Sequence, residues 1–305
     1  AQGGGEIRVA AGGSIQSSDY RPDLAQYVGL HGWARQLQAL DGSGDFGWYT
    51  ARDFNRGLLS QGGGRIDVRA GADVGHLVAI APGGGYRVAG DESSPATERH
   101  FRGGSVQVRA GRDIVDGVFE AGGATLDLQA GRDIAQRDNG AQLNPGTRVY
   151  HEDTAVRIDA RRDLTLSQLS SRYADYGNNG TGFGENIQGL DNHASATAVA
   201  TAGAFRLSAG ANYSNEDNVQ VLLPDSTRIA APNGTLSLEA PLLQQPARDG
   251  RLVALAGQDL VVTGELVVNA TQTTAAPGAH WQTPEESVAE SLGVLTDGSG
   301  ALDQS

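Results

Sequence analysis

Five aspartates recur at one position of a repeated pattern, and they are the first candidates for chemistry. Three of them directly follow an arginine, in Arg112-Asp113, Arg132-Asp133 and Arg162-Asp163. Carboxylates grouped beside a cation are the groups with which glycan-cleaving enzymes perform acid–base chemistry. This pattern is serial, whereas a catalytic site is a single place. The sequence therefore favours a structural role, in which each Asp caps a tight corner and Arg neutralises the stacked charge. The five are Asp73, Asp113, Asp133, Asp163 and Asp259.

The rest of the sequence offers no catalytic residue, metal site or cofactor site. The chain has no cysteine, which excludes disulfides, thiol nucleophiles and zinc–thiolate sites. Its 6 histidines show no metal-ligand spacing. The G-x-S-x-G, H-E-x-x-H and phosphate-loop motifs are missing from it as well. We therefore expect a protein that is not an enzyme and needs no cofactor.

The aspartates belong to a module that alternates apolar and polar residues. Clear copies are GGGRIDVRAGADV (62–74), GGSVQVRAGRDI (103–114) and GGATLDLQAGRDI (122–134). Each copy has the period of two that is typical of a β-strand, then a corner with glycine, then another apolar residue. The alanine that closes the first strand is expected at Ala11, Ala70, Ala110, Ala130, Ala160, Ala209, Ala240 and Ala256.

Strands this short cannot bury an apolar face alone, so successive copies are expected to stack as coils. The predicted fold class is all-β, a right-handed parallel β-helix (β-solenoid) with loop and helix excursions. Up to roughly a dozen coils of about 20 residues would make a rod about 60 Å long. Phe205/Leu207 and Leu236/Leu238 are expected at the same inward positions as Ile66/Val68. The alternative, an antiparallel β-sandwich, gives no reason for the same residues to recur at the same corner.

The chain divides into a repeat domain and a tail. The β-helix domain is predicted over residues 1–270, with insertions at about 17–60, 81–102 and 171–200. Residues 271–305 leave the alternating pattern, and their TPEE sequence is a capping box that begins a helix. The tail is therefore expected to be a helical cap or a linker to the next segment. With no Met and no signal-like apolar run, the chain is expected to be a fragment of a longer polypeptide.

The first insertion carries most of the large aromatic residues, and it is the predicted place for a ligand. Exposed aromatic rings stack on the C–H faces of sugars. The same rings can instead fasten the insertion to the rod. If the chain binds a glycan, the expected ligand-binding residues are Trp33, Trp48, Tyr49 and Phe54.

Charge limits the class of partner. The 23 basic residues are all arginine, and against 36 acidic residues they give a net charge of −13. Such a chain lacks the positive surface with which proteins bind nucleic acid. No run approaches the roughly 18 consecutive apolar residues of a membrane-spanning helix. We therefore expect no nucleic-acid partner and no membrane span.

The module resembles the repeats of filamentous haemagglutinin-type exoproteins, which Gram-negative bacteria export by two-partner secretion. The resemblance rests on the pattern G-G-x-[LIV]-x-[LIV]-x-A-G-x-D-[IL] and on WYTARDFNRGLLSQGGG (48–64), and it covers about 3–170 well and 200–270 more loosely. It implies an extracellular segment at the bacterial cell surface, exported in the full-length protein by an outer-membrane secretion partner. The implied function is cell adhesion or biofilm cohesion through a polysaccharide or a host or bacterial cell-surface glycan.

Two other functions remain open from the sequence. The chain can be a β-helix polysaccharide lyase or hydrolase, which predicts a single cleft with convergent carboxylates. It can also be the passive stalk of a contact-dependent toxin-delivery exoprotein, which predicts no ligand at all.

Overall fold

A computed structural model describes most of the repeat domain. All regular structure among the described residues is β-strand, and no helix in those stretches is long and apolar enough to cross a membrane. The described residues are 5–17, 57–60, 63–81, 84–88, 97–101, 103–137, 146–152, 154–171, 194–208, 221–247, 251–264 and 266–270.

Each coil of the fold holds three short strands, and the coil that begins at Val106 shows why. The sequence VQVRA forms β9 (Val106–Ala110), with its valines buried in the core and the polar side chains between them on the outer face. A corner leads to β10 (Ile114–Val115), and a second corner leads to β11 (Val118–Gly122). We call the corner between the first and second strands of a coil the first corner.

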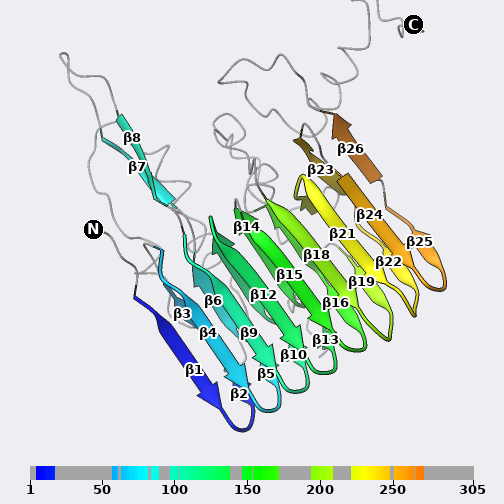
Figure 1. The fold of residues 1–305 in the computed structure, drawn as a ribbon, viewed down its shortest axis with the longest axis horizontal. Coiled ribbons are helices and arrows are strands. Elements are labelled where there is room, and N and C mark those ends of the chain that lie inside the picture. Colours follow the sequence, from blue (N-terminus) through cyan, green and yellow to red (C-terminus); the bar gives the residue numbers. More distant parts are fainter. Residues whose placement is uncertain are drawn as a thin grey trace, which may run out of the picture.

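Corresponding strands of successive coils pair in parallel, so the coils stack along one axis (Figure 1). The first strands form one sheet: β1 (Ile7–Ala11), β4 (Ile66–Ala70), β9, β12 (Thr125–Ala130), β15 (Ala155–Ala160), β18 (Ser195–Ala200), β21 (Ser226–Ala231) and β24 (Arg251–Ala256). The second strands form another: β2 (Ile15–Gln16), β5 (Val74–Gly75), β10, β13 (Ile134–Ala135), β16 (Leu164–Leu166), β19 (Phe205–Leu207), β22 (Leu236–Leu238) and β25 (Leu260–Val262).

The third strands complete eight coils, which we number 1 to 8 along the chain. A five-stranded sheet holds β3 (Leu58–Leu59), β6 (Val78–Ala81), β11, β14 (Arg148–Glu152) and β17 (Gln168–Ser171). A three-stranded sheet holds β20 (Val221–Leu223), β23 (Leu242–Ala247) and β26 (Leu266–Ala270), and β17 lies beside β20. One antiparallel hairpin, β7 (Gly84–Val88) with β8 (Thr97–Phe101), leaves the stack after β6.

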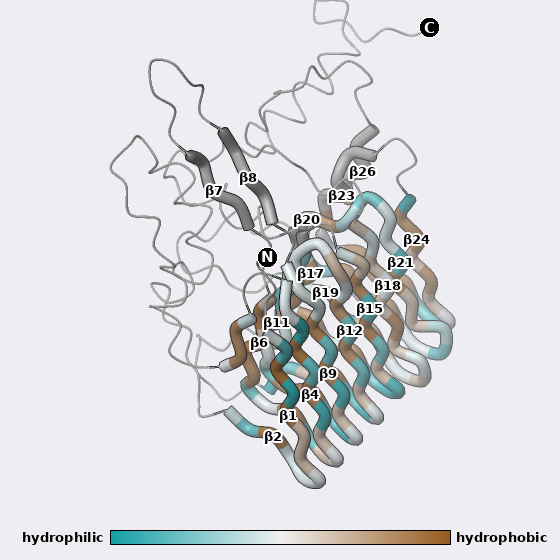
Figure 2. The backbone as a smooth tube through the Cα atoms, turned by 60° about the vertical axis from the view of Figure 1, so that its left-hand side comes forward, coloured by the Kyte–Doolittle hydropathy of each residue, from teal (hydrophilic) through white to brown (hydrophobic). Residues whose placement is uncertain are grey.

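In-register pairing turns the alternating pattern into continuous apolar columns. Ile66, Val106, Leu126 and Val156 pair in sequence along the first sheet, and each is at most 4% exposed. The polar residues between them face outward, so apolar and polar positions alternate along these strands in Figure 2. The columns of the three faces meet in one core that runs along the stack.

The predicted all-β parallel β-helix is confirmed. The described coils number eight rather than a dozen, because the insertions lengthen several coils well beyond the minimum. At a strand spacing of about 4.8 Å, eight coils span roughly 34 Å.

The expected closing alanines of coils 6 and 7 were wrong. The column that contains Ala160 continues through Ala200, not Ala209, and Ala231 rather than Ala240 pairs with Ala256. The strands that end there, SATAVA and STRIAA, have Ala or Thr at most inward positions. Their alternation is too weak in hydrophobicity to be recognised from the sequence.

The expected place of two strand pairs was wrong for the same reason. Phe205/Leu207 pair with Leu164/Leu166, and Leu236/Leu238 pair with Phe205/Leu207. They therefore lie in the second sheet, not in the sheet of Ile66.

Each of the three predicted insertions contains at least one strand. β3 lies within 17–60, the hairpin β7–β8 lies within 81–102, and β18 ends the segment 171–200. The predicted helical cap at 271–305 falls outside the described residues.

A close approach between coils leaves no room for a Cβ at the first corner of coil 3. A Cβ on Gly111 would lie 2.2 Å from the carbonyl oxygen of Gly71, whereas a Cβ on Gly12 in coil 1 would meet nothing within 4 Å. We predict that Gly111→Ala forces coils 2 and 3 apart and lowers the free energy of unfolding by about 1–3 kcal/mol. Gly12→Ala, at the same position of the corner, should change it by less than about 0.5 kcal/mol. Urea unfolding monitored by circular dichroism measures both, and equal effects would contradict this explanation.

Candidate functional site

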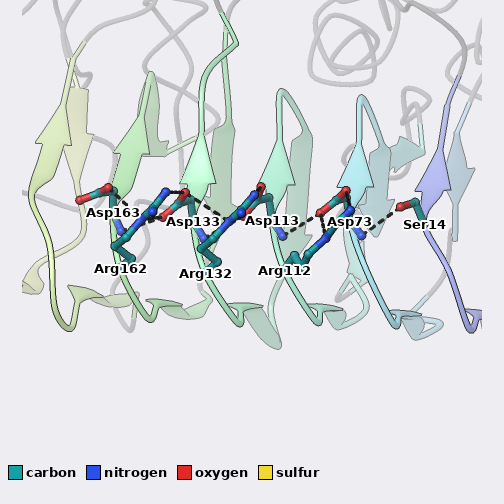
Figure 3. A network of polar contacts seen from close by, with 8 residues as sticks. All are labelled: Ser14, Asp73, Arg112, Asp113, Arg132, Asp133, Arg162 and Asp163. Carbon is teal, nitrogen blue, oxygen red and sulfur yellow. Dashed lines mark hydrogen bonds and ion pairs between the residues drawn. The ribbon is translucent and has the colours of Figure 1, made fainter.

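The sequence-predicted aspartates of coils 2 to 5 lie at one corner of the stack (Figure 3). Each directly precedes the second strand of its coil, and these strands pair in register. With the three arginines that precede them, they form what we call the aspartate–arginine ladder: Asp73, Asp113, Asp133, Asp163, Arg112, Arg132 and Arg162. The serial arrangement expected from the sequence is therefore present.

Each arginine of the ladder binds the aspartate of the preceding coil. Arg112 donates from Nε and Nη2 to the two carboxylate oxygens of Asp73, at 3.1 and 2.6 Å. Arg132 binds Asp113 in the same two-pronged way, with 2.8 Å between Nε and Oδ1. Arg162 repeats this arrangement on Asp133. Each guanidinium therefore connects two coils through a bidentate ion pair.

The same carboxylates accept backbone hydrogen bonds from the following coil. Oδ1 of Asp73 accepts from the N–H of Asp113 at 3.2 Å, and Oδ1 of Asp113 accepts from the N–H of Asp133 at 3.2 Å. The series continues from Asp133 to Asp163 and ends where Asp163 accepts from the N–H of Ala204. The sequence suggested that each Asp caps its own corner, but the structure shows that it caps the corner of the next coil.

These contacts determine the chemistry that the ladder can perform. The hydrogen bond from Arg132 lowers the pKa of Asp113, and the paired carboxylates raise the pKa of Arg132 and Arg162. An ionised carboxylate held between a guanidinium and a backbone N–H has no proton to give at neutral pH. The ladder therefore suits connection between coils better than general acid catalysis.

Asp259 occupies the same position on coil 8 but lies apart from the ladder. The register runs from Leu164 through Phe205 and Leu236 to Leu260. Ala204 and Thr235 therefore precede the second strands of coils 6 and 7 and separate Asp259 from Asp163. Asp259 is exposed.

The predicted ligand-binding aromatics, Trp33, Trp48, Tyr49 and Phe54, lie outside the described residues. The structure therefore does not test the expected ligand-binding role of these four residues, which stays a prediction.

Sequence reasoning missed a buried polar group on the outer face of the third sheet. Glu120, Arg148 and Tyr150 are 1%, 3% and 1% exposed. They alternate with Phe119 and Val149, which face the core, and Tyr150 pairs in register with Glu120. The third strands lack the repeated module. The only signal in the sequence that could have indicated this group is the presence of charged residues within the largely apolar strands VFEAG and RVYHE.

No metal site accompanies these groups in the part of the chain that the structure describes. There, no three His, Asp or Glu side chains come together in a way that could hold a metal ion.

Comparisons with protein-family models, curated proteins and solved structures found no match to this chain. Its function must therefore be inferred from its own residues and from the resemblance of its module.

Removal of a ladder carboxylate should weaken the contact between coils 3 and 4. Asp113→Ala leaves the buried N–H of Asp133 without its acceptor and Arg132 without its ion pair, so we expect a loss of about 1–3 kcal/mol in the free energy of unfolding. Asp259→Ala, at the same position outside the ladder, should cost less than about 0.5 kcal/mol. Urea unfolding of dilute protein at neutral pH measures both variants. A similar cost for the two would show that the ladder adds no stability.

The ladder should also make stability depend on acid. The pKa of Asp113 is lower in the folded chain than in the unfolded chain, where it is about 3.9. The stabilisation is thus complete above that value and is lost as the pH falls through the lower, folded pKa. Asp113→Asn removes this titration, so its urea midpoint should fall less than that of the wild type between pH 6 and pH 3. The same fall in both proteins would exclude this role of Asp113.

Proposed function

We propose that this chain is a structural and adhesive segment of a secreted bacterial surface filament, without enzymatic activity. In this proposal the rod is exported through an outer-membrane partner, stands at the cell surface and supports cell adhesion or biofilm cohesion. The resemblance of the module to filamentous haemagglutinin-type repeats suggests the setting. The observation that carries the proposal is that the ladder carboxylates are bound to groups of neighbouring coils.

Asp73, Asp113 and Asp133 each bind a guanidinium and a backbone N–H, and Asp163 accepts the N–H of Ala204 and pairs with Arg162. Asp113, for example, holds the guanidinium of Arg132 and the N–H of Asp133. An acid–base pair for glycan cleavage needs one protonated and one free carboxyl group facing the same bond. The repeated groups instead connect neighbouring coils, which suits a protein whose role is mechanical.

The buried polar group of the third sheet favours the same conclusion. Glu120 and Arg148 have the chemistry of a glycan-cleaving site, but their exposed fractions are only 1% and 3%. A polymer cannot reach side chains that are covered to this degree. The rival proposal of a polysaccharide lyase or hydrolase therefore gains no support from the ladder or from Glu120 and Arg148.

A stiff stack also provides a physical mechanism for adhesion. Parallel pairing connects every coil to the next one along the first two sheets, and along the third face it connects coils 1 to 5 and coils 6 to 8. A rod of this kind holds binding surfaces away from the cell, and weak contacts along many filaments add through avidity. An acidic surface with a net charge of −13 keeps such a rod soluble by repulsion.

A binding experiment separates the proposed function from its two rivals. The full chain is co-sedimented with bacterial exopolysaccharides and host glycans, and soluble sugar products are measured in parallel. We expect saturable binding without products, and a loss of at least tenfold in affinity when Trp33 and Trp48 are replaced by Ala, because lost stacking costs about 1.4 kcal/mol or more.

Trp281→Ala is the matched control, since Trp281 is the remaining tryptophan. Release of sugar products would overturn the proposal in favour of an enzyme. Absence of both binding and products would favour a passive stalk.

A further inference from the structure

The apolar core ends abruptly at coil 8. Leu260, Val262 and Leu266 are 51%, 46% and 45% exposed, although their register partners Leu236, Leu238 and Leu242 are at most 1% exposed. The same inward columns that are sealed one coil earlier are therefore open at this end of the rod.

The outer face of coil 8 is apolar as well. Leu255 points outward and is 44% exposed, and Val261 is 39% exposed. On coils 2 and 3 the row of Leu255 contains Arg69 and Arg109 instead. β24 and β25 are also the last strands of their sheets, so one edge of each has backbone groups without a described partner strand. Edge strands of soluble proteins usually contain charges or proline that prevent pairing with another chain.

Coil 1, at the other end of the stack, has a complementary edge. β1 and β2 are the first strands of the same two sheets (Figure 1), and their inward residues Ile7, Val9 and Ile15 are only half-buried. The outward residue in the row of Leu255 is Ala10, which is also apolar. Both edges therefore show apolar positions in the same register.

The first corners of coils 1 and 8 also match in length. Three residues separate Ala11 from Ile15, and three separate Ala256 from Leu260. In the ladder, each Asp accepts the N–H of the residue at the same position on the next coil. By that geometry, Asp259 is placed to accept the N–H of Ser14 from a coil stacked upon it.

We propose that two copies of this chain join head to tail, with coil 1 of one copy stacked on coil 8 of the other. Leu260 then packs on Ile15, Leu252 on Ile7 and Leu255 on Ala10, and the edge strands pair in parallel. The contact joins two different ends, so every addition leaves both edge types free. The chain therefore assembles into linear filaments.

The geometry favours a second copy over an unrelated partner. Parallel pairing along β24 and β25 requires two strands that are joined by a corner of the same length, which is three residues here. β1 and β2 meet this requirement with apolar residues at each inward position, and they bring no charge over the Leu260 column. This proposal does not depend on glycan binding.

Sedimentation velocity of the full wild-type chain over a wide concentration range tests the assembly. We expect a mass that rises with concentration beyond two copies of the 31.6 kDa chain. Leu260→Arg blocks one end and Ile15→Arg blocks the other, so each variant alone should stay monomeric. In an equimolar mixture, the intact coil 1 of the Leu260→Arg variant can still stack on the intact coil 8 of the Ile15→Arg variant. The mixture should therefore form dimers that grow no further.

Val199→Arg is the matched control, because Val199 lies in the outward row of Leu255 but in the middle of the stack; it should assemble like the wild type. If an end variant fails to fold, amide hydrogen exchange of the wild type replaces it, and protection of residues 251–262 should increase with concentration.

A wild-type chain that is monomeric throughout, or whose 251–262 amides are protected independently of concentration, would overturn the proposal and leave residues 271–305 as the occupant of the edge. Dimers formed by a single end variant would also overturn it, since they would show contact between like ends.

Discussion

The hydrogen-bonded register between successive coils is the constraint on which the rest of this structure depends. Once Ala70 pairs with Ala110, every residue of the two strands and of the corner that follows has a fixed counterpart one coil away. Repetition in the sequence then becomes repetition in space. The inward columns, the close contact between glycines and the ladder are three consequences of that single register.

The ladder shows how a chain with so many acidic residues can stack them in one row. Asp73, Asp113 and Asp133 each receive a guanidinium and a backbone N–H from the following coil, so these stacked negative charges are separated by positive groups. Where coils 6 and 7 lack Asp and Arg, their first corners are longer by one residue. There, the side chain of Asn233 donates to the backbone carbonyl of Thr201 at 2.7 Å. Different side chains thus serve the same connection between coils.

A stack of this kind has two surfaces of different character. The outer face of its first sheet consists mainly of polar rows, whereas the outer face of its third sheet holds buried residues such as Val118 and Tyr150. Its ends are cross-sections of the core, and at coil 8 apolar residues such as Leu260 and Val262 are exposed because no described coil covers them. We therefore propose glycan binding at the first insertion and growth of the rod at the ends.

The sequence by itself determined the strand period, the parallel stack and the corner at which Asp73, Asp113, Asp133 and Asp163 meet, because strong alternation and a repeated corner leave one way to bury the apolar face. It did not reveal the first strands of coils 6 and 7, whose inward residues are mostly alanine and differ too little from their outward neighbours. Only the tertiary structure decided that each carboxylate caps the next coil rather than its own, that Glu120 and Arg148 are buried, and that Leu260 is not. Those properties depend on what lies one coil away, and that neighbour is 20 or more residues distant in the sequence.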